Sequence, residues 1–316
     1  MAMLSHEEMI GLQAEKHDLI RTNDFKTREE YVLHLIHAFP YVQAARFAEH
    51  HTVLDFGCNT GYGTAIVSRS AKKIVGVDVS AKAISSAHEQ HGHLGIDFQL
   101  IDGTRLPFSD HTFDIVISFQ VIEHIVDYEQ YIRELKRVLS PQGIVLLTTP
   151  NALLRLDPGM KPWNRFHVRE FEASGFQALL GTFFSTVGIF GLFAPDDLYS
   201  VEVNRVRRAR ENARNKSRRE RAAPFRASVS ATARATATRM LPASLLATTR
   251  AFRHAMASVW NPKSRVPAVE QAFMDEHTLE DLFYRRNDLQ SALDLLALCG
   301  DNRDRVEDCR QRLKME

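Results

Sequence analysis

Three residues, Asp78, His124 and His167, have side chains and positions that suit binding and catalysis. Asp78 ends an apolar run of strand length, where a carboxylate can accept two hydroxyl hydrogen bonds, each worth about 1.5–3 kcal/mol. His124 and His167 follow two later apolar runs, and an imidazole titrates near neutral pH. These residue types predict a site that binds a hydroxylated ligand and moves a proton.

A glycine-containing turn follows the first apolar run, in the segment DFGCNTGYG at residues 55–63. Glycine at a strand end permits a tight turn with positive φ, and small residues let backbone amides approach a ligand at the next helix. The dinucleotide-binding fingerprint requires G-x-G-x-x-G, whereas the corresponding positions here hold Gly57, Asn59 and Tyr62. The pattern therefore disfavours a nicotinamide or flavin cofactor.

Strand and helix patterns alternate between residues 52 and 150. Apolar, β-branched runs predict strands at Thr52–Phe56, Lys73–Asp78, Ile96–Ile101, Phe113–Ser118 and Gly143–Thr148. Helical spacing predicts helices at Tyr62–Ser70, Ala81–His91 with Ser80 as the N-cap, and Tyr128–Leu139. Such alternation predicts a parallel sheet covered on both faces, with ligands at the carboxyl ends of its strands.

The composition is ordinary for a soluble globular protein. The chain has 316 residues, of which 44% are hydrophobic and 25% charged, enough for one large domain or two modest ones. Its three cysteines are too few for a disulfide framework, which predicts a reducing cytoplasm. Glu7 and Glu8 stand where a signal peptide needs a basic start, so we expect no export.

The uncharged stretch Ala173–Pro195 tests this expectation, because about 20 residues can span a bilayer. Polar residues interrupt it, its first half has helical spacing, and its second half is rich in β-forming residues. We predict a buried helix followed by a buried strand at 186–193 rather than a membrane span. With the apolar run Ala292–Cys299, this strand completes a doubly wound, mostly parallel α/β sheet of seven strands, and the two added strands lie at its edge.

Charge is distributed unevenly along the chain. Residues 205–265 contain 16 basic and two acidic residues, while the rest contains 24 basic and 37 acidic residues. The apolar residues between 241 and 260 recur at helical intervals among arginines, which predicts a basic amphipathic helix. Three roles are open for this segment. It packs on its own domain, it attaches to an anionic membrane through residues 205–262, or it binds nucleic acid. The last role is disfavoured because aromatic residues do not alternate with the arginines.

The ordered set of motifs resembles class I S-adenosylmethionine-dependent methyltransferases over about residues 50–152. It consists of VLDFGCNTGYG, GVDVS, Asp102-Gly103, LPFSDHTFDIVISFQVIEHI and RELKRVLSPQGIVLLTTPN. Within that family the chain is most similar to bacterial enzymes that methylate sugars of surface polysaccharides and glycolipids, and to ubiquinone-pathway O-methyltransferases. NRFHVREF at 164–171 and LDLLALC at 293–299 add less specific support.

The resemblance implies S-adenosylmethionine as the cofactor and assigns roles to matching positions. The glycine turn would line the methionine moiety, Asp55 would help hold its amino group, Asp78 would accept both ribose hydroxyls, and Asp102 would meet the adenine amino group. Asn59 departs from the usual second glycine, but asparagine tolerates left-handed backbone, so we expect the turn to form. The implied cofactor-binding set is Asp55, Gly57, Cys58, Asn59, Gly61, Asp78, Val79, Asp102, Gly103, Phe119 and Gln120.

Two histidines are candidates for the base that a hydroxyl acceptor would need. His124 is favoured over His167, although each has a structural alternative, as a helix cap or as an anchor of the loop around residue 160. Trp163 either stacks on a substrate sugar or anchors that loop. The remaining histidine groups lack cysteines or carboxylates at metal-ligand spacing, so we expect no metal site.

These observations predict four regions. An N-terminal helical lid occupies residues 1–51, the S-adenosylmethionine-binding core 52–204, a basic helical insertion 205–265, and a C-terminal helix and last strand 266–316.

The predicted activity is O-methylation of a sugar hydroxyl in a lipid-linked or surface glycan precursor, as a step of polysaccharide biosynthesis. The predicted location is the cytoplasm, with peripheral contact at the inner membrane face. One alternative is O-methylation of a small aromatic such as a quinone or polyketide, and another is a non-catalytic binding or scaffold protein. RNA methylation is a weaker alternative. The acceptor atom and the oligomeric state are left open.

Overall fold

The computed structural model describes residues 25–237 and 268–316, with side chains described only to residue 216 in the long helix that ends at 237. Its centre is a single eight-stranded sheet in the order β3-β2-β1-β4-β5-β8-β6-β7. The strands are β1 (Thr52–Phe56), β2 (Lys73–Asp78), β3 (Asp97–Leu100), β4 (Phe113–Phe119), β5 (Leu139–Pro150), β6 (Thr186–Phe193), β7 (Phe283–Arg285) and β8 (Asp294–Gly300).

The strands β1 to β5 run parallel to one another, whereas β8 runs antiparallel to both β5 and β6, and β7 runs antiparallel to β6. This arrangement confirms the doubly wound, mostly parallel α/β class. The sheet has one strand more than predicted, because β7 has three residues and is too short to show a strand pattern in the sequence.

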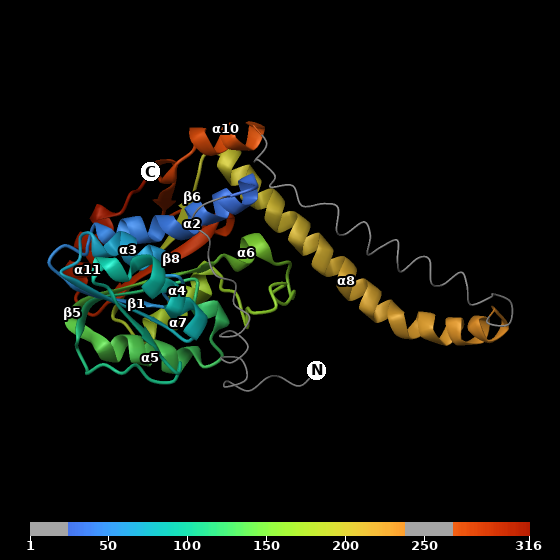
Figure 1. The fold of residues 1–316 in the computed structure, drawn as a ribbon, viewed down its shortest axis with the longest axis horizontal. Helices are drawn as coiled ribbons and strands as arrows, with labels where there is room; N and C mark the ends of the chain where they lie inside the picture. Colours follow the sequence, from blue (N-terminus) through green and yellow to red (C-terminus); the bar gives the residue numbers. More distant parts are fainter. Residues whose placement is uncertain (1–24, 238–267) are drawn as a thin grey trace.

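Helices cover both faces of the sheet (Figure 1). One apolar layer joins the sheet to α2 (Arg28–Ala45), α3 (Tyr62–Ser68), α4 (Ala81–His91) and α11 (Arg303–Arg312), and the other joins it to α5 (Tyr128–Val138) and α7 (Ala173–Gly181). Side chains alternate between the layers along each strand, so Val53 faces the first layer and Leu54 the second. The shorter helices are η1 (Gly92–Leu94), η2 (Ile122–His124), α6 (Ala152–Arg155), α10 (Ala268–Glu276), η4 (Leu279–Asp281) and η5 (Leu289–Ser291).

The predicted core elements match the structure closely. β1, β2 and α4 have the predicted bounds, and the hydroxyl of Ser80 caps α4 by accepting a hydrogen bond from the Ala83 amide. β5 begins at Leu139, four residues before its predicted start, because Leu139 already pairs with Phe113 of β4 ahead of a register shift. Among the described residues before β1, which begin at 25, α2 is helical as expected, and the role of the N-terminal region as a lid stays a prediction.

The uncharged stretch forms the predicted buried helix and strand, α7 and β6. No helix in the described ranges is both long and apolar enough to cross a membrane. The strand from the second apolar run, β8, lies between β5 and β6, so the expectation that the two added strands form the edge is wrong. The short β7 occupies that edge instead.

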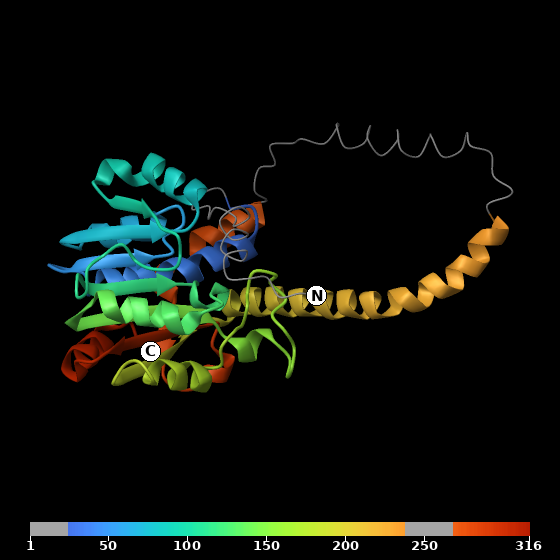
Figure 2. The ribbon, with the colours of Figure 1, turned by 90° about the horizontal axis from the view of Figure 1, so that it is seen from below.

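The basic segment continues a helix that belongs to the core. α8 (Asp196–Ala237) begins nine residues before the predicted insertion and, at about 1.5 Å per residue, is about 63 Å long. Its first turns are buried at Leu198 and Val206, and it then runs away from the body (Figures 1 and 2). Arg208 pairs with Glu29 of α2. The predicted amphipathic helix at 241–260 lies outside the described residues.

Candidate functional site

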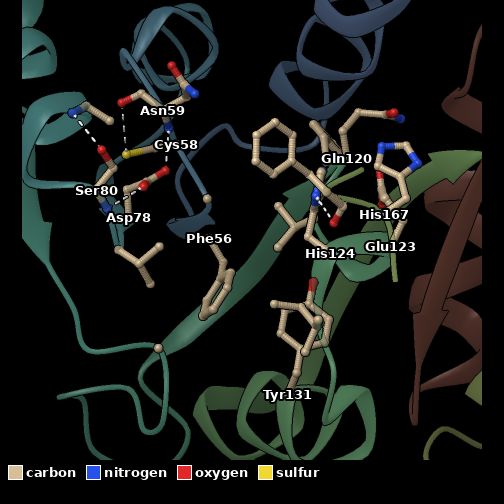
Figure 3. Close-up of a pocket in the computed structure, with 18 of the residues that line it drawn as sticks. Phe56, Cys58, Asn59, Asp78, Ser80, Gln120, Glu123, His124, Tyr131 and His167 are labelled. Carbon is tan, nitrogen blue, oxygen red and sulfur yellow. Dashed lines mark hydrogen bonds between the residues drawn. The ribbon is translucent and has the colours of Figure 1, made fainter. Parts of the chain in front are cut away.

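A cavity of about 690 Å³ opens at the carboxyl ends of the central strands, within the size range of small-molecule sites. It has two chemically different ends, shown in Figure 3: the turn after β1 with Asp78 at one end, and Gln120 with the histidines at the other. Ten predicted residues line it: Gly57, Cys58, Asn59, Asp78, Val79, Gly103, Phe119, Gln120, His124 and His167. Asp55, Gly61 and Asp102 do not line it.

The turn between β1 and α3 requires its glycines. Gly57 and Gly61 have φ angles of 83° and 76°, and Asn59 has 47°, so the predicted left-handed asparagine is confirmed. A Cβ on Gly57 would lie 2.5 Å from a methyl carbon of Val121, and one on Gly61 would lie 2.6 Å from the ring of Phe98. The turn therefore folds only with small residues, and its backbone lies against the cavity.

Asp55 lies beneath this turn with no exposed surface. Its Oδ2 accepts a 2.6 Å hydrogen bond from the Thr64 hydroxyl, while Oδ1 has no hydrogen-bond partner among the described residues. Burial raises the pKa of Asp55 to about 7. Such a carboxyl favours a cationic or hydrogen-bond-donating partner. Burial also raises the pKa of Cys58, which makes its thiol a poor nucleophile.

Asp78 ends β2 at the edge of the cavity. Its carboxylate accepts hydrogen bonds from the amides of Asn59, at 2.9 Å, and Ser80, at 2.8 Å. The two amides orient the side chain, and a carboxylate has about four acceptor positions, so its predicted hydroxyl ligands are compatible with this arrangement.

Asp102 is exposed, unlike Asp78, although Gly103 beside it lines the cavity. Asp102 Oδ1 accepts 2.8 Å hydrogen bonds from the amide and the hydroxyl of Thr104. The hydrogen bond donated by the Thr104 amide lowers the pKa of Asp102. The contact predicted between Asp102 and an adenine stays a prediction.

Phe119 ends β4, and Gln120 follows it at the histidine end of the cavity. The ring of Phe119 packs edge-on against Tyr41 of α2, with centroids 4.7 Å apart. The Gln120 amide nitrogen donates to the Thr148 hydroxyl at 3.1 Å and to the carboxyl of Asp294 at 2.6 Å. Burial raises the pKa of Asp294 well above its usual range. These bonds hold Gln120 against β5 and β8.

The two predicted bases lie together at the far end. Their rings meet edge to face with centroids 4.8 Å apart. His124 Nδ1 lies 3.0 Å from the Phe166 carbonyl, and His167 Nδ1 lies 2.7 Å from Glu170 Oε1. The sequence separates these histidines by 43 positions, and the loop after α6 brings them together.

Sequence reasoning missed two glutamates at this end. Glu123 is buried, lines the cavity, and accepts a 3.1 Å hydrogen bond from the Thr149 hydroxyl, and burial raises its pKa to about 8. Glu170 has a fully buried carboxylate that contacts His167 and Arg155. The spacing of His167 and Glu170, three residues apart, was the available signal.

Glu123, His124 and His167 form a compact cluster that the sequence did not predict. A carboxylate oxygen of Glu123 and one ring nitrogen of each histidine all lie within 4.8 Å of one another. In the described part of the chain, no other group of three or more histidine, cysteine, aspartate or glutamate side chains comes together in this way.

Side chains that can donate hydrogen bonds line the cavity together with the two histidines. The guanidinium of Arg155 lies 4.2 Å above the ring of Trp163, whose buried Nε1 has no partner among the described residues. Arg205 of α8 also lines the cavity, and burial together with the charge of Arg205 lowers the pKa of His37 to about 3. Arg205 was missed because the sequence placed its segment outside the core.

Comparison with known proteins finds similarity in the central part of the chain. Residues 54–147 match a family described as "Methyltransferase domain". A Mycolicibacterium smegmatis protein named "Probable S-adenosylmethionine-dependent methyltransferase" is 35% identical over 147 residues, which are 46% of this chain and 56% of that protein. A Mycobacterium tuberculosis protein of the same description is 33% identical over 159 residues, 50% of this chain and 57% of that protein.

A Rhizobium etli protein named "Ubiquinone biosynthesis O-methyltransferase" is 30% identical over 115 residues, which are 36% of this chain and 46% of that protein. The chain spans about half the length of the curated relatives it matches. The family match includes the glycine turn, Asp78 and His124, but ends before Arg155, His167 and Arg205. The far end of the cavity is thus built largely from residues beyond the matched segment.

Proposed function

We propose that this chain, which carries a class I S-adenosylmethionine-dependent methyltransferase domain at residues 54–147, O-methylates a sugar hydroxyl of a lipid-linked or surface glycan precursor. The observation that carries the proposal is the pairing of two different ends in one cavity. The turn after β1 and Asp78 form one end, and His124 with His167 forms the other.

The turn end fits S-adenosylmethionine, the cofactor of this class of domain. Gly57 lets the backbone lie where a side chain would clash, Asp55 has a carboxyl oxygen without a partner, and the Asp78 carboxylate is held by two amides. We assign the ribose hydroxyls to Asp78 and the amino group to the Asp55 side of the turn. When bound, the cofactor supplies a methyl group on a sulfonium sulfur.

The histidine end supports an oxygen nucleophile. Methyl transfer needs an acceptor atom held in line with the methyl carbon, so positioning supplies much of the rate. A hydroxyl also benefits from a base, and this end has two imidazoles at the cavity wall. The name of the Rhizobium etli relative, an O-methyltransferase, supports the same chemistry.

Donor groups at that end support an acceptor rich in oxygen atoms. The buried Nε1 of Trp163 can only donate a hydrogen bond, and the guanidinium groups of Arg155 and Arg205 are also donors. Sugar hydroxyl and ring oxygens match donors at several positions around the cavity. The stacking of a sugar on Trp163 finds less support, because Arg155 lies over one face of its ring.

A small aromatic acceptor is the second candidate. The ubiquinone-pathway relative favours it, and the apolar wall formed by Phe56, Tyr41 and Phe119 would accept an aromatic ring. A quinone or polyketide intermediate would need fewer of the donors described above. The two candidates therefore differ in whether Trp163 and Arg155 contact the acceptor.

We also propose that the basic segment brings the cytoplasmic enzyme to the anionic inner face of a membrane, where a lipid-linked acceptor would be found. Residues 205–265 carry 16 basic and two acidic residues, and each basic residue near such a surface contributes about 1 kcal/mol. A role for the N-terminal helices as a lid belongs to the same proposal, because Tyr41 and His37 of α2 line the cavity.

The function is tested with methyl-labelled S-adenosylmethionine and a cell extract separated into lipid, polysaccharide, small-molecule and nucleic-acid fractions. Label is expected in the lipid or polysaccharide fraction with the wild type and not with Asp78→Ala. Label only among small molecules would favour the aromatic acceptor, and label in nucleic acid would favour RNA methylation. Cofactor binding without transfer to any fraction would favour a binding protein.

A further inference from the structure

We infer that Glu170 positions His167 as the base that removes the proton from the acceptor hydroxyl. The inference rests on the proposed function and goes beyond it in choosing between the two histidines. It also assigns a role to Glu170, which lies within the NRFHVREF motif but was given no role from the sequence, and which lies outside the matched methyltransferase segment.

The carboxylate of Glu170 is held from two sides. Its side chain has no exposed surface, Oε1 lies 2.7 Å from His167 Nδ1, and Oε2 accepts a 2.9 Å hydrogen bond from Arg155 Nε. Burial alone would raise the pKa of Glu170, but the hydrogen bond with His167 and the charge of Arg155 lower it overall. Glu170 is therefore ionised at neutral pH and acts as a fixed hydrogen-bond acceptor.

This acceptor determines where the proton of His167 is located. An ionised carboxylate can only accept hydrogen bonds, so Nδ1 of the neutral imidazole carries the hydrogen and Nε2 carries the lone pair. The backbone supports the same geometry, because the His167 amide donates to the Asn164 carbonyl and the Val168 amide donates to the Glu123 carbonyl. The backbone around His167 is therefore held by its own loop and by η2, which contains Glu123.

The two histidines differ in the charge of the described group that contacts Nδ1. His124 Nδ1 faces the neutral carbonyl of Phe166, whereas His167 Nδ1 faces an ionised carboxylate. An imidazolium is stabilised more by a charged acceptor than by a neutral one. Among the described ionisable neighbours, Glu123 is mostly protonated at pH 7, His37 is neutral, and Arg155 bonds to Oε2 of Glu170 rather than to Oε1, which faces His167.

The proposed step conserves atoms and charge. The acceptor O–H bond breaks and its proton goes to Nε2 of His167. The oxygen bonds to the methyl carbon as the carbon–sulfur bond breaks and its electron pair stays on the sulfur. Glu170 stays ionised and stabilises the imidazolium that forms, so it is a positioning residue rather than a catalytic one.

The first test needs no acceptor. Proteins labelled with ¹⁵N in their histidine rings are compared by NMR as wild type, Glu170→Gln, Glu170→Asp and His167→Asn, the last of which assigns the His167 signals. The wild type is expected to show neutral His167 with its proton on Nδ1. In Glu170→Gln the pH midpoint of its titration is expected to fall, and Glu170→Asp is expected to restore it in part. A proton on Nε2 in the wild type, or a midpoint equal in all variants, would overturn the inference.

The second test uses the extract fraction that accepts label from the wild type. Glu170→Gln is expected to lower kcat by about 10²-fold with little change in the KM for S-adenosylmethionine, and to move the acidic limb of the pH–rate profile to lower pH. His167→Asn is expected to lose more activity than His124→Asn. Equal losses, or an activity that EDTA removes and Mg²⁺ or Zn²⁺ restores, would overturn the assignment of His167 as the base.

The two tests separate the inference from the function on which it rests. A wild type that transfers no label to any fraction would refute the proposed function and the catalytic part of the inference. The NMR result would still decide whether Glu170 sets the tautomer of His167. Near-identical circular dichroism spectra of Glu170→Gln and the wild type serve as the folding control, and Glu170→Asp retains the carboxylate if Glu170→Gln unfolds.

Discussion

At the scale of single residues, Asp78 gives the clearest test of cofactor binding. Its carboxylate is held by the amides of Asn59 and Ser80 at the carboxyl end of β2. Asp78→Ala is expected to weaken S-adenosylmethionine binding at least about tenfold, because two charge-assisted hydrogen bonds are lost. Isothermal titration calorimetry measures this change. Asp97→Ala, at the opposite end of the neighbouring β3, is the matched control and is expected to bind like the wild type.

Glu123 predicts a pH dependence of stability. Its pKa in the folded protein, about 8, lies above the value of 4.5 expected when it is unfolded, so between these pH values the folded state holds more protons. The free energy of unfolding therefore falls as pH rises through this window, by up to about 1.4 kcal/mol per pH unit for this group. Asp55 has a pKa of about 7, so it adds to the fall in the free energy of unfolding up to about that pH.

Urea unfolding at pH 5.5, 6.5 and 7.5 measures this slope. Glu123→Gln is expected to flatten it, because the amide neither gains nor loses a proton. Glu129→Gln, an exposed glutamate of α5, is the control and is expected to keep the wild-type slope. Equal slopes in Glu123→Gln and the wild type would contradict the assignment of a neutral, buried Glu123.

At the scale of elements, the turn between β1 and α3 is the part of the site that depends most on backbone shape. Gly57→Ala adds a Cβ that lies 2.5 Å from Val121 and also strains a φ of 83°. Gly95→Ala strains a φ of 72° but meets nothing within 4 Å. Both variants are expected to lose about 1 kcal/mol or more for the backbone strain, and Gly57→Ala more than Gly95→Ala because of the contact. Thermal unfolding compares them, and equal losses would exclude the clash.

Most core elements could be predicted because strand and helix signals alternate there without interruption. β1, β2 and α4 begin and end where the apolar runs and the Ser80 cap indicated. β7 could not be predicted, since three residues carry no period, and its place follows from pairing with β6. The order of β8 and β6 also depends on pairing that no local pattern records.

The candidate site also contains residues that the sequence could predict and residues that it could not. The turn and Asp78 were predictable because they follow strands in a known order, and they lie at the cavity as expected. Glu170, Arg155 and Arg205 were not, because their roles depend on loops and on a helix that pack against one another only in the folded chain. Asp102 is exposed and bonds to Thr104, and its predicted contact with an adenine stays a prediction.

At the scale of the whole molecule, α8 joins the cavity to the basic segment. Arg205 lines the cavity, Arg214 pairs with Asp157, and the helix then leaves the body (Figure 2). A change near the start of α8 would therefore alter the cavity.

Membrane attachment is tested by replacing Arg218, Arg219, Arg221 and Arg226 with glutamine. The full chain is expected to sediment with vesicles that contain phosphatidylglycerol, less so as salt is raised, and the variant is expected to lose most of this binding. The control replaces Arg303, Arg310 and Arg312 of α11 with glutamine. This helix lies on the side of the body away from the projecting part of α8 (Figure 1), and the control is expected to bind like the wild type. Equal binding of both variants would assign the attachment to another surface.

We propose that the chain transfers a methyl group to a sugar oxygen, and identification of the methylated atom tests this directly. The wild type is incubated with ¹³C-methyl S-adenosylmethionine and the lipid fraction of a cell extract, and the product is hydrolysed and analysed by NMR and mass spectrometry. We expect an O-methylated monosaccharide with the wild type and none with Asp78→Ala. A ¹³C-methyl group on an aromatic oxygen or on a nitrogen would contradict it.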